Sequence, residues 1–173
     1  MVISAAMGAF ALVLPVAFHA AGLGSKFLPM LLPLLLNGFL VRWRWALATA
    51  LVVPWISAFA TGMPPVYPPV AVIVSAEGAV MAVTASLLYR RGRSRVWAAL
   101  IPAVLAGRMA CFVTAWLLAR VFALPPGLAA LAATLEGLPG VALQLAVVPL
   151  VLRLLGRRKG PLFGAGAADT GAG

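Results

Sequence analysis

Long apolar segments separated by short polar linkers make up most of this 173-residue chain. A helix that crosses the roughly 30 Å hydrocarbon core of a bilayer needs about 20 predominantly apolar residues. Six segments come near that length, and they predict helices over residues 3–20, 27–41, 45–61, 69–89, 96–118 and 127–155. The pattern therefore predicts an all-α integral membrane protein, a bundle of six transmembrane helices.

The linkers are short, which is typical of antiparallel helices that follow one another along the chain. We therefore expect residues 1–159 to form a single transmembrane domain. The first apolar segment has no basic residues before it, so we expect a retained helix and not a cleaved signal peptide. Residues 160–173 are rich in glycine and alanine, and we expect them to be a disordered tail.

The composition excludes a water-soluble domain. Only 9% of the residues are charged and 64% are hydrophobic, whereas about a quarter of a typical soluble domain is charged. The net charge of +10 would suit a nucleic-acid-binding protein. However, the basic residues occur in short clusters between apolar segments, where they determine topology. We therefore expect a lipid bilayer, and no nucleic acid, as the partner of this surface.

Basic residues are concentrated in alternate linkers, which indicates the orientation of the chain. Ten of the 13 fall on one side: Arg42, Arg44, Arg90, Arg91, Arg93, Arg95, Arg153, Arg157, Arg158 and Lys159. The opposite side has only Lys26 and Arg120. Because cytoplasmic loops carry the excess of Lys and Arg, we expect both termini in the cytoplasm. Aromatic residues expected at this membrane boundary are Trp43, Trp45, Tyr89 and Trp97.

Three ionisable residues fall inside the apolar segments, where such residues usually serve function. Glu77, Arg108 and Glu136 lie about eight to ten residues from the outer ends of their predicted helices. We expect them at a common depth, with the amide Asn37 near that level and Gln144 deeper. This arrangement predicts a polar substrate-binding pocket in the outer half of the bundle. It leaves open whether Arg108 pairs with Glu77, with Glu136 or with a ligand.

The loop of residues 61–69 (TGMPPVYPP) is stiff, because proline restricts the backbone and removes hydrogen-bond donors. Met63, Pro64, Pro65 and Tyr67 would form either a lid over the pocket or a simple connector. The first segment has small residues at four-residue spacing, Ser4 with Gly8 and Ala5 with Ala9. Such faces allow helices to approach closely, within the bundle or against a partner subunit.

We find no pattern of catalytic or metal-binding residues in the sequence. His19 is the single histidine and has no second ligand at suitable spacing, and Cys111 is the single cysteine. No phosphate-binding loop, catalytic triad or zinc motif is present. We therefore expect no enzyme activity, metal or cofactor, and any energy input has to come from another chain or from a gradient.

Taken together, several blocks resemble the substrate-binding (S) components of energy-coupling-factor (ECF) transporters. The blocks are LPVAFHAAGLG (14–24), FLPMLLP (27–33), LVVP (51–54), TGMPP (61–65), Glu77, LYRR (88–91), AGR (106–108) and GLPGVALQ (137–144). The chain looks most like the group that includes the folate and pantothenate S components. Many relatives have a small residue where this chain has Asn37, which either marks a substrate preference or is incidental.

The resemblance implies a six-helix fold with a vitamin pocket near the outer face of a prokaryotic cell membrane. It implies docking onto an ECF membrane scaffold subunit that carries two cytoplasmic ATPase subunits, with Ala5 and Ala9 on the docking face. The expected function is substrate capture for an ATP-driven importer of a water-soluble vitamin or related metabolite. The alternative is a structural membrane protein in which a buried ion pair joins the helices and no ligand binds.

Overall fold

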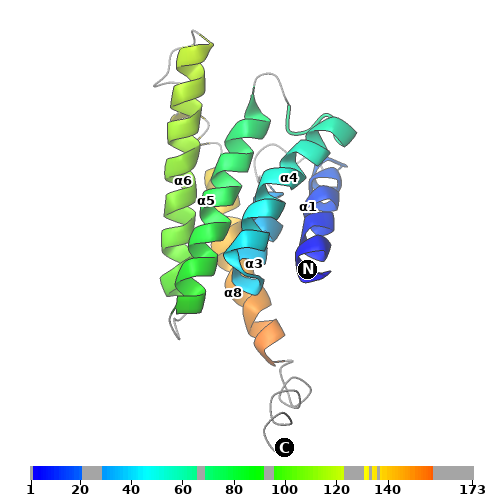
Figure 1. The fold of residues 1–173 in the computed structure, drawn as a ribbon, viewed down its shortest axis with the longest axis vertical. Helices are drawn as coiled ribbons and strands as arrows, with labels where there is room; N and C mark the ends of the chain where they lie inside the picture. The colour runs from blue at the N-terminus through cyan, green and yellow to red at the C-terminus, as the bar shows by residue number, and fades with distance from the viewer. Residues whose placement is uncertain are drawn as a thin grey trace, which may run out of the picture.

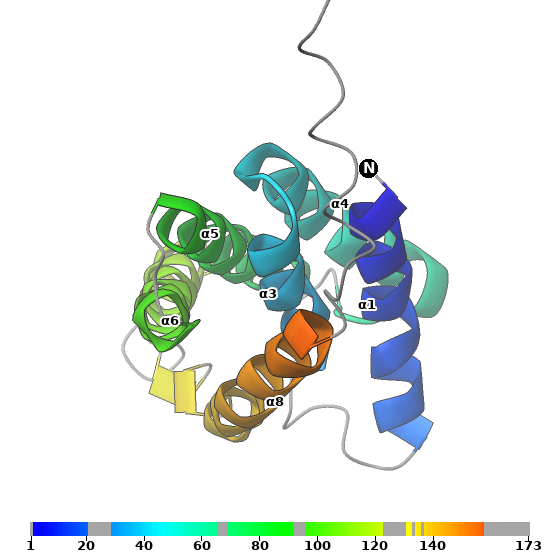
Figure 2. The same cartoon turned by 90° about the horizontal axis from the view of Figure 1, so that it is seen from below.

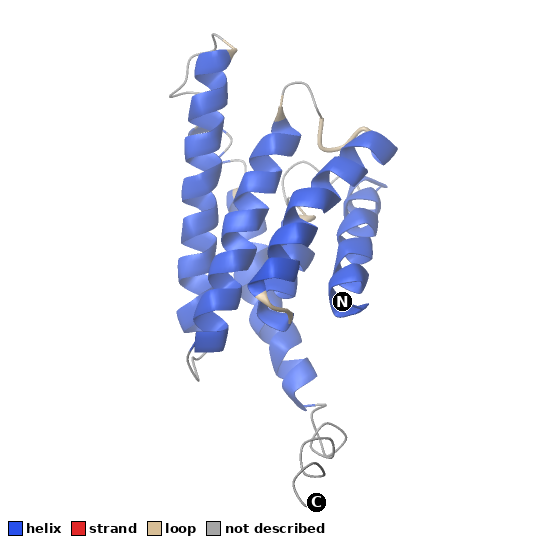
Figure 3. Cartoon of the chain, in the orientation of Figure 1, coloured by secondary structure: helices blue, strands red, loops and turns tan. Residues whose placement is uncertain are grey.

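The computed structural model describes residues 2–20, 29–65, 69–91, 96–122, 131–132, 134–135 and 137–157. Every regular element in these residues is an α-helix (Figure 3). The helices are α1 (Val2–Ala20), α3 (Leu31–Leu40), α4 (Trp43–Thr61), α5 (Val70–Arg91), α6 (Val96–Val121) and α8 (Leu138–Arg157). The structure therefore confirms the all-α bundle.

Four helices, α4, α5, α6 and α8, are long and apolar enough to cross a membrane. The apolar stretch of α1 and the whole of α3 are shorter. The helices run side by side, and the first turn of α1 and the last turn of α8 point to the same end of the bundle (Figure 1). The two predicted cytoplasmic ends of the helical part therefore lie on one side.

Two helices begin later than the sequence pattern suggested. The helix α3 starts at Leu31, after Pro29 and Met30 form a turn. The helix α8 starts at Leu138, although apolar residues extend back to position 127. Pro139 lies in the first turn of α8, where its missing N–H breaks no intrahelical bond. Pro29 therefore lies just before α3, and Gly137 and Pro139 lie at the start of α8. Hydropathy alone does not locate these helix starts.

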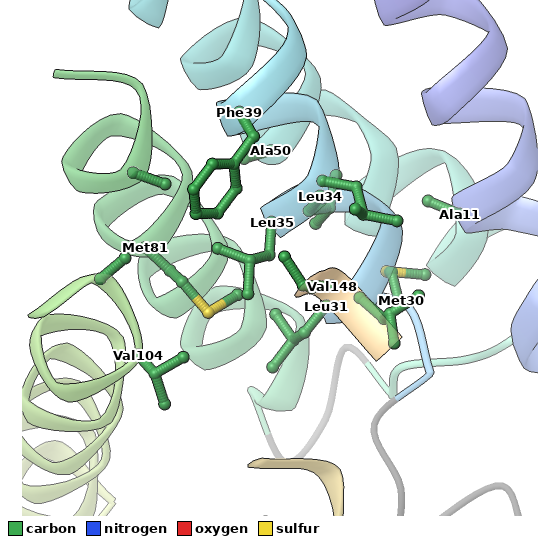
Figure 4. Packing of buried hydrophobic residues seen from close by; sticks show 14 of the residues in the cluster. Ala11, Met30, Leu31, Leu34, Leu35, Phe39, Ala50, Met81, Val104 and Val148 are labelled. Carbon is green, nitrogen blue, oxygen red and sulfur yellow. The ribbon is translucent and has the colours of Figure 1, made fainter. Parts of the chain in front are cut away.

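The short helix α3 lies at the centre of the bundle (Figure 2). It packs against α1, α4, α5 and α8, and all its residues from Leu31 to Phe39 are buried. Figure 4 shows its leucines between Met81 and Val104 on one side and Ala11 on the other. A helix that is apolar on nearly every face is stable in a protein core or in lipid, and here neighbouring helices bury it.

The helix α6 has two contrasting faces. Small residues at every fourth position are buried: Ala99, Ala103, Gly107, Cys111, Ala115 and Ala119. Large apolar residues at the same spacing are exposed: Trp97, Ile101, Leu105, Met109, Val113, Leu117 and Val121. Small residues let helix backbones approach closely within a bilayer, and here they allow α6 to pack along α5. The large residues form the surface that faces lipid.

Candidate functional site

Glu77 on α5 and Arg108 on α6 form a buried ion pair in the middle of the bundle. The contact joins Nη2 of Arg108 to Oε1 of Glu77. Glu77 is only 1% exposed, and the Arg108 side chain is 11% exposed. Both helices are apolar around these residues, so each charge has little access to water. The structure therefore brings together two of the three ionisable residues expected at a common depth.

Gly107 explains why the two helices can meet at this point. A Cβ atom added to Gly107 would lie 3.0 Å from Cβ of Met81 and 3.5 Å from the backbone oxygen of Glu77. The α6 backbone therefore lies directly against the α5 turn that carries Glu77. Arg108 follows Gly107 in the chain, and this close approach places its guanidinium within reach of the carboxylate.

The pair balances its own charge but not all of its hydrogen-bonding groups. Taking a charge out of water costs several kcal/mol, and an opposite charge offsets that cost only where the geometry and remaining hydrogen bonds are good. Within the part of the chain that the structure describes, Nη1 of Arg108 is buried and has no hydrogen-bond partner. A buried donor without a partner is costly, so this nitrogen is available to a polar group from outside the described bundle.

Gln144 on α8 is a second buried polar side chain with unused capacity. It is 2% exposed, and its Oε1 atom has no hydrogen-bond partner among the described residues. One turn further along α8, Val148 joins the core around α3. Gln144 therefore points into the bundle and not toward lipid. It has an unused acceptor, whereas Arg108 has an unused donor.

Asn37 belongs to a different cluster. Its Nδ2 atom donates a hydrogen bond of 3.1 Å to the Ser4 hydroxyl, which lies 2.6 Å from the Thr49 hydroxyl. Thr49 and Ser4 both also donate to the backbone oxygen of Trp45, at 2.8 and 3.3 Å. The contacts join α3 to α1 and α4, whereas Glu77 faces α6. The structure thus does not place Asn37 at the Glu77–Arg108 pair.

The sequence analysis did not identify Ser4 and Thr49 as partners of Asn37, although a signal was present. Each of the three residues lies a few positions from the predicted cytoplasmic end of its helix, on three consecutive antiparallel helices. Such residues share a level in the bundle and can form hydrogen bonds across it. Their shared depth at that end is the signal in the sequence that groups them.

Two of the predicted site residues lie outside the described residues. These are Glu136 and, in the loop before α5, Tyr67. The described part of that loop is joined to α4. The hydroxyl of Ser57 donates to the backbone oxygen of Met63 at 2.6 Å, and Gly62 adopts a left-handed φ of 72° after the last turn of α4. Pro65 accepts a bond of 3.2 Å from the Ala71 N–H, so the loop also contacts the start of α5.

The structure separates the two small-residue pairs of α1. Ser4 and Gly8 are buried, and a Cβ atom on Gly8 would contact Val53 and Thr49 of α4. Ala5 and Ala9 are exposed on the other side of the helix. The first pair therefore serves packing within the bundle, whereas the second leaves a flat apolar surface open.

Comparison with known proteins gave one match. The family model described as the substrate-specific component of ECF transporters matches residues 1–152. A search of curated proteins and a search of solved structures each found no match.

Proposed function

We propose that this chain, which belongs to the family of ECF transporter substrate-specific components, captures a water-soluble vitamin or a related small metabolite for import. Membership makes the chain a multi-pass membrane protein and a substrate-binding transport subunit. The identity of the substrate and the coupling of its import to ATP are the parts that we propose. The folate- and pantothenate-binding members are the group whose ligands we would test first.

The observation that supports a ligand site is that buried polar atoms on α6 and α8 have no hydrogen-bond partner among the described residues. The Nη1 atom of Arg108 offers a donor and Oε1 of Gln144 offers an acceptor, and both are buried. A protein that used these residues only to hold helices together would gain stability by satisfying both atoms internally. We infer that a ligand satisfies them, with Glu136 as a further predicted contact.

Binding sites of this kind gain affinity when they exclude water, which gives the proline-rich loop a role. We propose that Met63, Pro64, Pro65 and Tyr67 cover the ligand from the outer side. The bond from Ser57 to Met63 fixes one end of this loop on α4. A segment that is held in place loses little conformational entropy when it covers a ligand, which favours tight capture.

Release of the ligand into the cell requires energy. We propose that the ECF scaffold subunit and its two ATPase subunits supply it. Family membership implies association with such subunits. The exposed face of Ala5 and Ala9 is the docking surface that we propose for the scaffold. The orientation that we propose, in a prokaryotic cell membrane with both termini in the cytoplasm, places the basic linkers on the side of the ATPases.

One observation favours a second candidate function. Glu77 and Arg108 neutralise each other without any ligand. In a structural membrane protein, the same pair would simply join α5 to α6. An experiment that removes both charges together separates the two functions, because removing one partner alone would leave a buried unpaired charge and destabilise any fold.

We would test the site with the double variant Glu77→Leu/Arg108→Met in the full chain. Replacing a buried ion pair by apolar residues of similar volume is often neutral or stabilising, so the variant should fold. Binding of a panel of water-soluble vitamins, including folate and pantothenate, would be measured by thermal shift. A ligand at 100 times its Kd stabilises the folded state by about 2.7 kcal/mol. We expect this stabilisation in the unmodified chain and its loss in the double variant.

Ser75→Ala provides a matched control. Ser75 is buried on α5 as Glu77 is, but its hydroxyl donates to Ala71 of the same helix at 2.8 Å. This variant should retain vitamin binding. A double variant that folds and binds its vitamin with unchanged affinity would show that the pair is structural and would overturn the proposed site.

A further inference from the structure

A pocket of about 320 Å³ opens where α3 connects to α4, at the opposite end of α4 from the Met63 loop. It is lined by Arg42, Arg44, Trp45 and Ala48. The residues that line it are separate from the Glu77–Arg108 pair and from Gln144. Its lining of two guanidinium groups and an indole suits a ligand that is both anionic and bound at a membrane surface.

The positive charge of this pocket is not balanced by the described part of the chain. Arg42 and Arg44 are exposed, and neither forms a salt bridge with a described carboxylate. The whole chain has only three acidic residues, of which Glu77 pairs with Arg108. Two adjacent arginines without a carboxylate partner repel each other, so an anion from outside the chain would stabilise them.

The residues around the pocket are of the types that occur at a membrane interface. Trp43 and Trp45 are 39% and 42% exposed, and the guanidinium of Arg44 lies 5.5 Å from the centre of the Trp43 ring. Exposed Trp residues beside Arg are typical of the region of the lipid head groups. Ser4 bonds to the backbone of Trp45, so the exposed apolar residues Val2 and Ile3 of α1 lie at the same end. The pocket therefore opens next to a surface suited to acyl chains.

We propose that Arg42, Arg44 and Trp45 form a binding site for the phosphate of an anionic phospholipid head group. Guanidinium groups bind phosphate oxygens through paired hydrogen bonds, and basic pockets between transmembrane helices are suited to anionic lipid head groups. The neighbouring apolar surface favours a lipid over a free phosphate ion, because only the lipid also places acyl chains along α1. A bound lipid would join the α3–α4 connection to α1.

The test uses native mass spectrometry of the full chain in detergent, titrated with dioleoyl phosphatidylglycerol or dioleoyl phosphatidylcholine. The unmodified chain should bind phosphatidylglycerol at least tenfold more tightly than phosphatidylcholine. In Arg42→Gln/Arg44→Gln this binding should weaken on the order of 10-fold to 30-fold, because each basic residue near an anionic lipid contributes roughly fivefold in affinity and the two contributions multiply. Arg42→Lys/Arg44→Lys keeps the charge but not the paired hydrogen bonds. Its affinity for phosphatidylglycerol should lie between those of the unmodified chain and the glutamine variant.

Arg90→Gln/Arg153→Gln is the matched control, because it removes two exposed arginines from the same predicted side without touching the pocket. It should change phosphatidylglycerol binding less than twofold. An equal loss in this control would show diffuse attraction to any basic surface and would overturn the site. Inorganic phosphate at millimolar concentration should not displace the lipid, and displacement would identify a free phosphate site instead.

A different partner would give a different result. If Arg42→Gln/Arg44→Gln bound phosphatidylglycerol as the unmodified chain does but no longer co-purified with the ATPase subunits, the pocket would be a protein contact and the lipid proposal would be wrong. Equal binding of the two lipids by the unmodified chain would overturn it without any variant. The helix content of each variant, measured by circular dichroism, confirms that folding is unchanged.

Discussion

Two clusters of polar residues in the described part of this bundle differ in chemistry. Glu77 and Arg108 form an ionic cluster, whereas Ser4, Asn37 and Thr49 form a neutral one. In the neutral cluster, Nδ2 of Asn37 and the two hydroxyl groups form hydrogen bonds with one another and with the backbone, whereas Oδ1 of Asn37 has no partner among the described residues. Hydroxyl and amide groups cost less to bury than charges, so such a cluster can join helices without a ligand. At the scale of single residues, the ionic cluster is therefore the better candidate for a ligand site.

The first prediction concerns the neutral cluster and uses a double-mutant cycle. Asn37→Ala and Ser4→Ala each remove one partner of the 3.1 Å bond between α3 and α1. We expect both single variants to be destabilised and their effects to be non-additive by about 0.5–1.5 kcal/mol, the range found for hydrogen bonds between transmembrane helices. Unfolding in mixed detergent micelles measures each free energy.

A second double-mutant cycle, which combines Asn37→Ala with Ser75→Ala, is the control. Ser75 bonds to Ala71 within its own helix, so these two effects should simply add. Additive effects in the Asn37–Ser4 cycle would contradict the interhelical bond. A loss of vitamin binding in Asn37→Ala at unchanged stability would instead return Asn37 to the ligand site, as the sequence suggested.

The packing between helices depends on positions where only a small residue fits. The buried face of α6 shows this along its whole length, and α3 depends on it at Gly38. Without a strong hydrophobic driving force between helices in lipid, association depends on close contact of backbones. At the scale of elements, such contacts determine how deeply α3 enters the bundle.

The second prediction compares two glycine positions. A Cβ atom on Gly38 would overlap the backbone of Ala82 on α5, which cannot move without shifting a helix. Gly38→Ala should therefore lower the free energy of unfolding by about 2 kcal/mol or more. Thermal unfolding in one detergent measures the change.

Gly8→Ala is the matched change for this prediction. Its Cβ atom would meet side-chain methyl groups of Val53 and Thr49 at 3.3 and 3.4 Å, and side chains can yield. We expect a change of less than about 1 kcal/mol, since alanine also favours the helix by a similar amount. Equal losses at both glycines would indicate that the α3–α5 contact is looser than the structure shows.

The described bundle has a largely apolar exterior and an apolar core that holds a few buried polar side chains, an arrangement suited to lipid. Large apolar side chains cover the outer face of α6, while the two polar clusters lie between helices. Four helices have the length and composition of membrane spans. The distribution of basic residues along the linkers then determines which end faces the cytoplasm.

The third prediction tests that orientation. In a Cys111→Ala background, which has no other cysteine, we would place single cysteines at Met63 and at Arg90. Both side chains are exposed, and they lie near opposite ends of α5. In intact cells, a membrane-impermeant maleimide should label the cysteine at Met63. It should label the one at Arg90 only after permeabilisation, and the reverse pattern would invert the orientation.

The fourth prediction concerns assembly. Ala5→Leu/Ala9→Leu fills the exposed small-residue face of α1 without entering the bundle core. We expect it to reduce co-purification with the scaffold and ATPase subunits by tenfold or more while vitamin binding is retained. Ala98→Leu, on the exposed face of α6, should leave assembly unchanged. Normal assembly of the α1 variant would exclude this face as the docking surface.

Much of the fold could be predicted from the sequence because a bilayer imposes a simple rule. Every backbone polar group has to be satisfied within the spanning segment, so long apolar runs become helices. This rule identified the all-α bundle and the approximate position of each helix. It could not predict that α3 begins only at Leu31 or that α8 begins at Leu138, because proline and glycine set those limits locally.

The sequence by itself determined the membrane bundle, the family and which ionisable residues fall inside its apolar segments, because hydropathy and charge are properties of each residue. Only the tertiary structure decided which of these residues meet. It paired Arg108 with Glu77, assigned Asn37 to Ser4 and Thr49, and turned Ala5 and Ala9 outward. Depth along a helix can be counted from the sequence. The direction in which a side chain points depends on how helices rotate and pack, which backbone contacts such as that at Gly107 determine.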